Sequence, residues 1–185
     1  MSRPVPPSQR FLRRPALIIA GVLVVGLCAF AVWYRSTYSM GTAQSFEVAG
    51  AGAAPRVLIA TQGSVFKDAV VAGIVTHLKE RSARIKVVDI SALPAIREGD
   101  WDAVAILHTW EMRKPPLVVA TFVKRWRNPE RLVVLTTSGA GNFKLQGVDA
   151  VSSASTLSDV PARVGEITQR LDRVLAAGAT TEAAP

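Results

Sequence analysis

The chain has 185 residues, enough for about one domain once an anchor and tails are set aside. Its formal net charge of +8 gathers at one end, because five of its 22 Lys and Arg residues flank an apolar segment near the N-terminus and no acidic residue precedes Glu47. From residue 36 onward, 17 Lys and Arg stand against 14 Asp and Glu, a net charge of +3, which excludes a general nucleic-acid-binding protein. The single cysteine, Cys28, excludes a disulfide framework, a cysteine zinc site and a cysteine nucleophile.

The first predicted element is a membrane anchor that runs from Ala16 to Tyr34 and contains no charged residue. As a helix, residues 16–34 span roughly 28 Å, close to the ~30 Å hydrocarbon core of a bilayer. Four arginines precede the segment and only Arg35 follows it closely. The positive-inside rule therefore predicts a single-pass protein of the bacterial inner membrane, with residues 1–15 in the cytoplasm and the domain outside it.

A cleaved signal peptide is the alternative for this segment. The tripeptide Ala29-Phe30-Ala31 offers a small-x-small cleavage site. The apolar run exceeds the ~7–15 residues usual in a signal peptide and continues past that site, which favours an uncleaved anchor.

Residues 35–55 are small, polar and rich in Gly and Ala, which predicts a flexible linker, and residues 177–185 are expected to form a disordered tail. Between them, residues 56–176 alternate between apolar runs and helical patterns. The runs predict strands at 56–60, 85–90, 103–107, 132–136 and 149–153, with helices at 65–80, 117–127 and 160–176 and a short helical or irregular link at 93–97.

Fully apolar strands that alternate with helices predict a three-layer α/β fold, a parallel sheet covered on both faces. Only about a dozen residues separate the last two strands, so the fourth helix is expected to be short or missing. In such sheets ligands bind beside the carboxyl ends of the strands. Functional residues are therefore expected within 61–64, 108–116 and 137–147.

Three segments of residues 56–176 resemble the flavodoxin-like family. Residues 57–64 (VLIATQGS), followed by a helix, are similar to the family's first strand and phosphate loop. Residues 87–90 and 101–107 are similar to its second and third strands, and residues 132–139 (LVVLTTSG) to its fourth. The likeness is greatest to the small branch that includes quinone-dependent protoporphyrinogen dehydrogenases. It implies a flavodoxin-like fold with a site for FMN.

The resemblance assigns FMN contacts to three loops. In the first, backbone N–H groups and hydroxyls would wrap the phosphate at a helix N-terminus. Phe66 departs from the family, which has a helix-capping threonine there, and Lys67 can supply a positive charge instead. Trp110 stands where a flavin platform is common, although an aromatic side chain there can also simply cover the end of the sheet. The residues implied are Thr61, Gln62, Gly63, Ser64 and Lys67 in the first loop, Thr109 and Trp110 in the second, and Ser138, Gly139, Gly141 and Asn142 in the third.

Two functions are compatible with this sequence. The first is a membrane-anchored module without cofactor or catalysis, which has lost tight FMN binding and contacts the bilayer and a membrane or periplasmic protein. Phe66 and the short fourth crossover favour it, and so does topology, because an exported domain crosses the membrane unfolded and would have to acquire scarce FMN outside. The second is an FMN-dependent electron-transfer protein or quinone-linked oxidoreductase at the membrane.

No other catalytic or metal centre is indicated. His77 lies on the apolar stripe of the first domain helix and is expected to be a packing residue. His108 ends a strand but has no second histidine nearby, which speaks against a metal site, and Gly63-Ser64 lacks the G-x-S-x-G pattern of a serine hydrolase. Basic residues beside Trp126 form either a solvated helix face or a contact surface for a partner protein or anionic headgroups. They are Arg113, Lys114, Lys124, Arg125, Arg127 and Arg131.

Overall fold

The computed structural model describes residues 18–31, 41–50, 52, 54–111 and 113–182, and the chain divides into two compact units, Met1–Ser39 and Met40–Pro185. In the first unit, residues 18–31 form a helix whose side chains are exposed. None of the helices in the described ranges is both long and apolar enough to cross a membrane. The predicted anchor, residues 16–34, extends beyond this helix into residues outside the described ranges, so membrane spanning stays a prediction.

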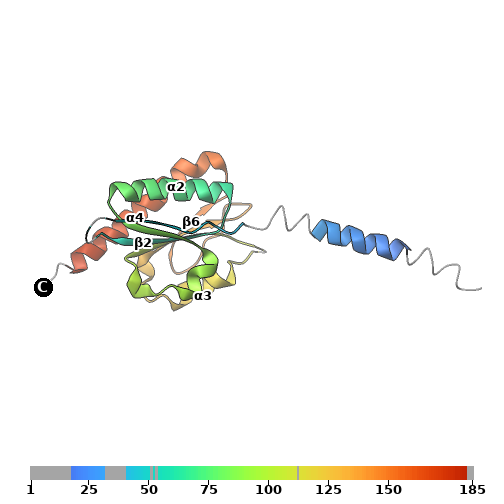
Figure 1. The fold of residues 1–185 in the computed structure, drawn as a ribbon, viewed down its shortest axis with the longest axis horizontal. Helices are drawn as coiled ribbons and strands as arrows, with labels where there is room; N and C mark the ends of the chain where they lie inside the picture. Colours follow the sequence, from blue (N-terminus) through green and yellow to red (C-terminus); the bar gives the residue numbers. More distant parts are fainter. Residues whose placement is uncertain (1–17, 32–40, 51, 53, 112, 183–185) are drawn as a thin grey trace, which may run out of the picture. The chain divides into compact units, whose positions relative to one another are not determined.

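The second unit is built on one six-stranded sheet with the order β1-β3-β2-β4-β5-β6 (Figure 1). All neighbouring strands are parallel except β1, which runs antiparallel to β3. The five parallel strands, numbered along the chain, lie in the order 2-1-3-4-5, which is the flavodoxin-like order. The predicted α/β fold with a mostly parallel, flavodoxin-like sheet is therefore confirmed. The strands are β1 (Phe46–Val48), β2 (Arg56–Thr61), β3 (Arg84–Asp89), β4 (Ala103–Thr109), β5 (Leu132–Thr137) and β6 (Asp149–Ser153).

Helices cover both faces of the sheet (Figure 1). Helix α2 (Val65–Glu80) and helix α4 (Val160–Glu182) pack together on one face, which we call the α2/α4 face. Helix α3 (Leu117–Arg125) and the 3-10 helix η1 (Ile90–Ala95) cover the other, the α3 face. Alternate strand residues enter the two cores, so the apolar runs of the sequence are buried on both sides, as expected for parallel strands.

An ion-pair cluster joins α2 to α4 on the first face. The Nε2 atom of His77 lies 3.0 Å from Oδ1 of Asp172, and the guanidinium of Arg81 lies 2.7 Å from the other carboxylate oxygen. His77 is half-buried, and the Nε–H of Arg81 donates to its Nε2 at 3.1 Å. It therefore links two helices through polar contacts, beyond the packing role expected from its position.

The prediction of a flexible linker over residues 35–55 is wrong for its later part, because β1 lies within it. Phe46–Val48 pairs with β3, the Lys86 ammonium lies 2.7 Å from the Glu47 carboxylate, and Val48 packs against the core of the α2/α4 face. A three-residue strand is too short to show a period of two. The predicted tail is corrected as well, since α4 continues through Glu182.

The connections on the α3 face are short. Between β3 and β4 the chain forms only η1 and a second 3-10 helix, η2 (Glu98–Asp100), where a full helix would be usual in this fold. Residues 138–148, between β5 and β6, contain no helix, which confirms the expected loss of the fourth helix. Among the described residues, α3 is therefore the only α-helix on its face of the sheet.

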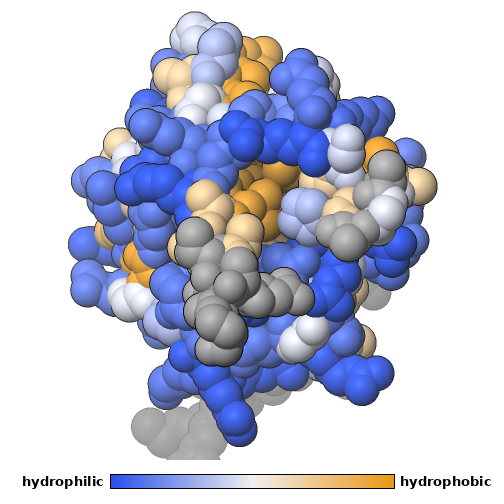
Figure 2. Space-filling model, turned by 90° about the vertical axis from the view of Figure 1, so that its left-hand side faces the viewer, coloured by the Kyte–Doolittle hydropathy of each residue, from blue (hydrophilic) through white to orange (hydrophobic). Residues whose placement is uncertain are grey.

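Figure 2 views the end of the domain at which the parallel strands begin. Its surface is mostly hydrophilic, and hydrophobic residues are seen mainly in a hollow near its centre. The polar strand residues that the sequence singles out lie at the opposite end, where the strands finish.

Candidate functional site

The centre of the candidate site is the side chain of Lys67, in the first turn of α2. Ser64 caps this helix, and its Oγ accepts from the backbone N–H of Lys67 at 3.2 Å. The Lys67 ammonium donates to Oγ of Ser64 at 3.2 Å and to Oγ1 of Thr109 at 2.8 Å. Oγ1 of Thr109 lies 2.8 Å from Oγ1 of Thr137. Hydroxyls from the ends of β4 and β5 are thus gathered around one ammonium group.

Lys67 is almost completely buried, with 1% of its surface exposed. Burial lowers the pKa of its ammonium to about 8, while the charges of Asp68 and Glu111 oppose the shift. At neutral pH the group is mainly protonated, so a positive charge lies under the surface at the carboxyl ends of the strands. A buried cation of this kind is a common feature of binding sites, but ion-pair networks produce it as well.

His108 lies next to Thr109 and on the opposite face of the sheet. It is fully buried, its Nε2 lies 3.3 Å from Oγ1 of Thr136, and its Nδ1 has no hydrogen-bond partner among the described residues. Burial lowers its pKa to about 4, and the charge of Lys67 adds to the shift. His108 is therefore neutral at pH 7. The described part of the chain contains no group of three His, Cys, Asp or Glu side chains that can hold a metal ion.

The first loop is occupied by a preceding part of the chain, residues 41–48, which we call the N-terminal strap. The Gly63 N–H donates to the Gly41 carbonyl at 2.7 Å, and the Gly41 N–H donates back at 2.9 Å. The Ala43 N–H then donates to Oδ2 of Asp89, at the end of β3, before the strap continues as β1. The strap therefore crosses the loop that the resemblance assigns to phosphate.

Gln62 in the first loop binds the neighbouring strand β4, and the Thr61 hydroxyl binds within the loop. The Gln62 N–H donates to the Leu107 carbonyl at 3.2 Å, and the Gln62 side-chain oxygen accepts from the Thr109 N–H at 2.7 Å. Oγ1 of Thr61 donates to the Gln62 carbonyl at 3.2 Å. Phosphate loops need backbone N–H groups that point at the anion. In this arrangement the N–H groups of Gln62 and Gly63 are already used, so the first loop does not fit a tightly held FMN phosphate.

Phe66 has a role other than the one implied by the resemblance. The helix cap is Ser64, two residues earlier, whereas the Phe66 ring is 4% exposed and belongs to the core of the α2/α4 face. The idea that Phe66 replaces a capping donor is therefore wrong for this chain.

The second and third loops meet through an aromatic pair. The rings of Trp110 and Phe143 are stacked, with centroids 4.7 Å apart and an angle of 8° between their planes. The Arg113 guanidinium lies 5.9 Å from the centre of the Phe143 ring. Rings stacked at this distance leave no space for a third ring between them. Phe143 was not among the site residues expected from the sequence. An aromatic residue in the third loop is nevertheless a usable sign of a partner for Trp110.

The third loop is a turn held against β6. The Ser138 N–H donates to the Ser153 carbonyl at 3.1 Å, and the Gly141 N–H donates to the carbonyl and hydroxyl oxygens of Ser138. Gly141 has a φ of 65°, and a Cβ there would come within 2.7 Å of the Ala154 nitrogen, so glycine is required. Gly139 and Asn142 are exposed. Gly141 thus serves the turn.

Comparisons with known proteins find distant structural similarity only. No family model and no curated protein matches the sequence. Solved structures similar to the chain include a flavodoxin from the domain Archaea, at 11% identity and a TM-score of 0.44, over 64% of this chain and 98% of that one. An oxidoreductase from Corynebacterium diphtheriae has 7% identity and a TM-score of 0.46, over 68% and 99% of the two chains.

A flavo di-iron protein mutant from Thermotoga maritima has 13% identity and a TM-score of 0.47, over 68% of this chain. This chain spans only 37% of that protein's length. Similarity at these identities concerns the fold alone, and the fold assignment rests on the strand order described above.

Proposed function

We propose that this protein is a flavodoxin-like domain that has lost tight FMN binding and acts as a non-catalytic protein-interaction or accessory module. The observation that carries the proposal is the pairing of Gly63 with Gly41, which uses the N–H group at the centre of the first loop. A ligand phosphate at this loop would have to displace the strap and break both hydrogen bonds.

Two further contacts support this proposal. The Ser64 hydroxyl is engaged by the backbone and the side chain of Lys67, so it serves the protein's own helix end. The Trp110 ring is covered by Phe143, so the expected flavin platform is already occupied by a side chain. Gly63, Ser64 and Trp110 thus each make an internal contact where the resemblance implies a ligand contact.

The second candidate function is an FMN-dependent electron-transfer protein or a quinone-linked oxidoreductase, the class to which the resemblance to protoporphyrinogen dehydrogenases points. One observation favours it. Trp110 and Phe143 come from two different loops at the carboxyl ends of β4 and β5, and two such rings can hold a planar ring between them if the loops separate. On this alternative the stacked pair is the closed form of a flavin slot.

The location of the module is a prediction from the sequence. Residues 16–34 would anchor it in a bacterial inner membrane with the domain on the outer side, and the partner would then be a membrane or periplasmic protein. An exported, anchored domain is suited to binding neighbours in the same membrane, because the anchor raises their effective concentration.

A flavin titration separates the two functions. The purified full-length chain is expected to lack absorbance near ~450 nm, and added FMN is expected to leave its melting temperature unchanged. A site that binds only the folded state stabilises it by about 2.7 kcal/mol at a hundredfold excess over Kd, which is several degrees for a domain of this size. A shift of that size with micromolar FMN, reduced by Trp110→Ala, would reject the module in favour of the electron-transfer function.

A further inference from the structure

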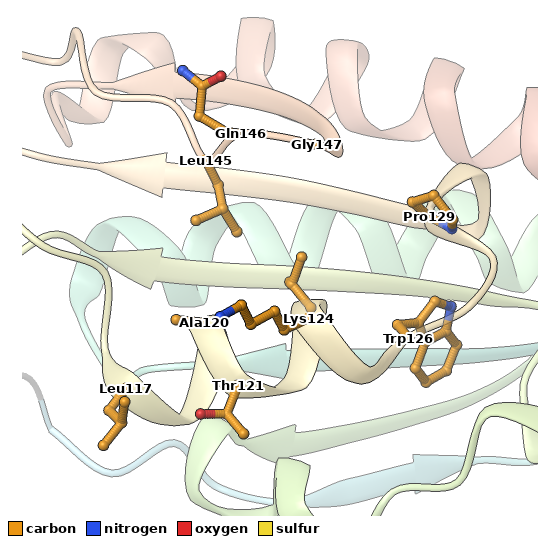
Figure 3. A pocket seen from close by; sticks show the side chains of 10 residues that line it. Leu117, Ala120, Thr121, Lys124, Trp126, Pro129, Leu145, Gln146 and Gly147 are labelled. Atoms are coloured by element: carbon orange, nitrogen blue, oxygen red, sulfur yellow. The ribbon is translucent and has the colours of Figure 1, made fainter.

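A groove runs along α3 on the side where the fold lacks its fourth crossover helix. The connection between β5 and β6, residues 138–148, passes this side of the sheet without a helix. The resulting groove has a volume of about 530 Å³ (Figure 3). Its position follows from the fold, since a crossover helix at this point would lie beside α3 and cover the same strands.

The walls of the groove are mainly apolar. Figure 3 shows Leu145 pointing from the β5–β6 connection toward α3, which forms the opposite wall, while Trp126 and Pro129 close one end. On α3 the groove is lined by Leu117, Ala120 and Val123, among others. These three residues are spaced by three, so they form a stripe along one side of the helix. Leu117 is 82% exposed, at the open end of the groove.

Leu117 also lines a second groove on the other side of α3. This one has a volume of about 490 Å³ and is formed with Pro94, Val118 and Phe122. Thr121 is likewise common to both grooves. The second groove is open because the β3–β4 connection forms the 3-10 helix η1 and not a full α-helix. Helix α3 therefore lies between two grooves. Concave, apolar walls of this shape accept side chains that project from another helix.

The segment that contains α3 is positively charged, and one of its cations lines the groove. Lys124 is the only charged residue among those that line it, and it has no ion pair among the described residues. From residue 111 to residue 131 the sequence contains six Lys or Arg and two Glu, a net charge of +4. Arg125 has a structural task, since its guanidinium donates to the carbonyls of Leu93 and Ile96 at 2.6 and 2.9 Å. Its side chain lines the second groove.

We propose that the groove between α3 and the β5–β6 connection binds an amphipathic helix of a partner protein, with an apolar stripe in the groove and acidic residues beside Lys124. This inference rests on the proposed function and names the chemistry of its partner. The apolar lining supplies affinity, and the charge of Lys124 selects acidic flanks. In the absence of its own fourth helix, the domain takes one from another chain.

Charge and shape argue against other occupants. A second copy would bring two faces of the same positive charge together, which disfavours a symmetric contact. An anionic membrane would match the charge but presents a flat surface, whereas Leu145 and Leu117 border a hollow. An acidic partner helix matches both the positive charge and the concave shape of the groove.

The test uses the full-length chain in zwitterionic nanodiscs and a designed helical peptide of about 18 residues. The peptide carries leucines at helical spacing and glutamates on both flanks, and its twin has lysine in place of every glutamate. Leu117→Asp and Lys124→Glu probe the groove. Leu117 is exposed and begins α3, where an acidic residue is tolerated, and Lys124 is exposed in the last turn. Leu157→Asp and Lys79→Glu are matched controls, an exposed leucine elsewhere and a lysine in the last turn of α2.

Calorimetry is expected to show saturable binding of the glutamate peptide, weakened about tenfold or more by each groove variant and less than about twofold by each control. Lys124→Glu should also improve binding of the lysine twin. The proposal is overturned if the glutamate peptide does not bind, or if control and groove variants lose affinity equally. It is also overturned if the chain forms a concentration-dependent dimer in sedimentation that Leu117→Asp abolishes. The same holds if binding to vesicles of anionic lipid requires Leu117 and Lys124 whereas binding of the peptide does not.

The flavin titration is run on the same preparations, so the two proposals fail separately. If the peptide does not bind and FMN does not raise the melting temperature, the proposal for the groove is rejected and the proposal of a non-catalytic module is kept. An FMN shift rejects the module whatever the peptide does.

Discussion

The burial of Lys67 predicts an unusual dependence of stability on pH. Its pKa falls from 10.5 to about 8 on folding because the ammonium loses water. Between these values the unfolded chain binds more protons than the folded one, so the free energy of unfolding must rise with pH. The penalty for the buried charge is fully present below pH ~8 and disappears as the pH approaches ~10.5. The shift corresponds to about 3 kcal/mol, of which 2 to 3 kcal/mol is recovered between pH ~7 and ~10.

The perturbation is Lys67→Met, which keeps a long side chain in the core and removes the charge. The free energies of unfolding of wild type and variant are measured with urea on residues 40–185 from pH ~7 to ~10. The difference between the two free energies is expected to change by about 2 to 3 kcal/mol over this range. At pH ~7 the variant should be at least as stable as the wild type, since Ser64 still accepts a backbone N–H and Thr109 still contacts Thr137.

The matched control is Lys79→Met, an exposed lysine on the same helix, whose curve should run parallel to that of the wild type. Other titrating groups are common to all three proteins and cancel in the differences. Parallel curves for wild type and Lys67→Met would refute the reasoning, because they would mean that the ammonium is hydrated in the folded state.

Three further predictions concern the strap and the anchor. Gly63→Ala should destabilise the domain by about 1 to 3 kcal/mol in urea unfolding, because the new Cβ would lie 2.9 Å from the Gly41 carbonyl oxygen. Gly41→Ala is the control and should change stability by less than about 1 kcal/mol, because its nearest contact would be at 3.4 Å. Equal effects would contradict the strap contact. A fragment of residues 40–185 should fold alone and melt several degrees above residues 54–178, which lack β1, in a calorimetric scan. A reporter active only outside the cytoplasm should be active when fused after Pro185, and activity of a cytoplasmic reporter there would reverse the predicted orientation.

The central architecture could be predicted because its signals are local. Each parallel strand is a run of apolar residues, and each is buried on two faces, so periodicity and hydrophobicity alone locate it. The predicted strands start and end within two residues of β2 to β6. The missing fourth helix could be predicted from chain length, since residues 138–148 are too few for a full crossover.

The strap could not be predicted because its partners are distant in sequence. Gly41 pairs with Gly63, and Ala43 with Asp89, so nothing in residues 41–48 alone specifies their conformation. Composition instead favoured a linker, because Gly, Ala and Ser are common there. Tertiary hydrogen bonds decided the outcome, and they leave no period in the sequence.

The sequence indicated which loops meet at the carboxyl ends of the strands, but not the surroundings of Lys67 and Phe66. The resemblance gave Lys67 only as a positive charge for the first loop, although Val71 and Ile74, which lie four and seven positions later, are buried on the same side of α2. That spacing was a usable sign of burial. The resemblance compared Phe66 with the family's capping threonine, whereas Val70 and Ile74, four and eight positions later, lie with its ring in the core of the α2/α4 face. Phe66→Thr would therefore remove a buried ring and destabilise the domain, with no gain for a phosphate site.

The two departures from a flavodoxin-like domain act in the same direction. Ligands of parallel sheets bind at the carboxyl ends of the strands, because loops there are free to carry polar groups. In this chain the strap and the Trp110–Phe143 pair fill that end with internal contacts. The loss of the fourth helix removes cover from a face of the sheet instead and leaves the groove beside Leu117. A small ligand needs a closed pocket with convergent polar groups, whereas a partner helix needs a long apolar groove. The internal contacts at the carboxyl ends and the open groove therefore both favour the proposed partner helix on α3.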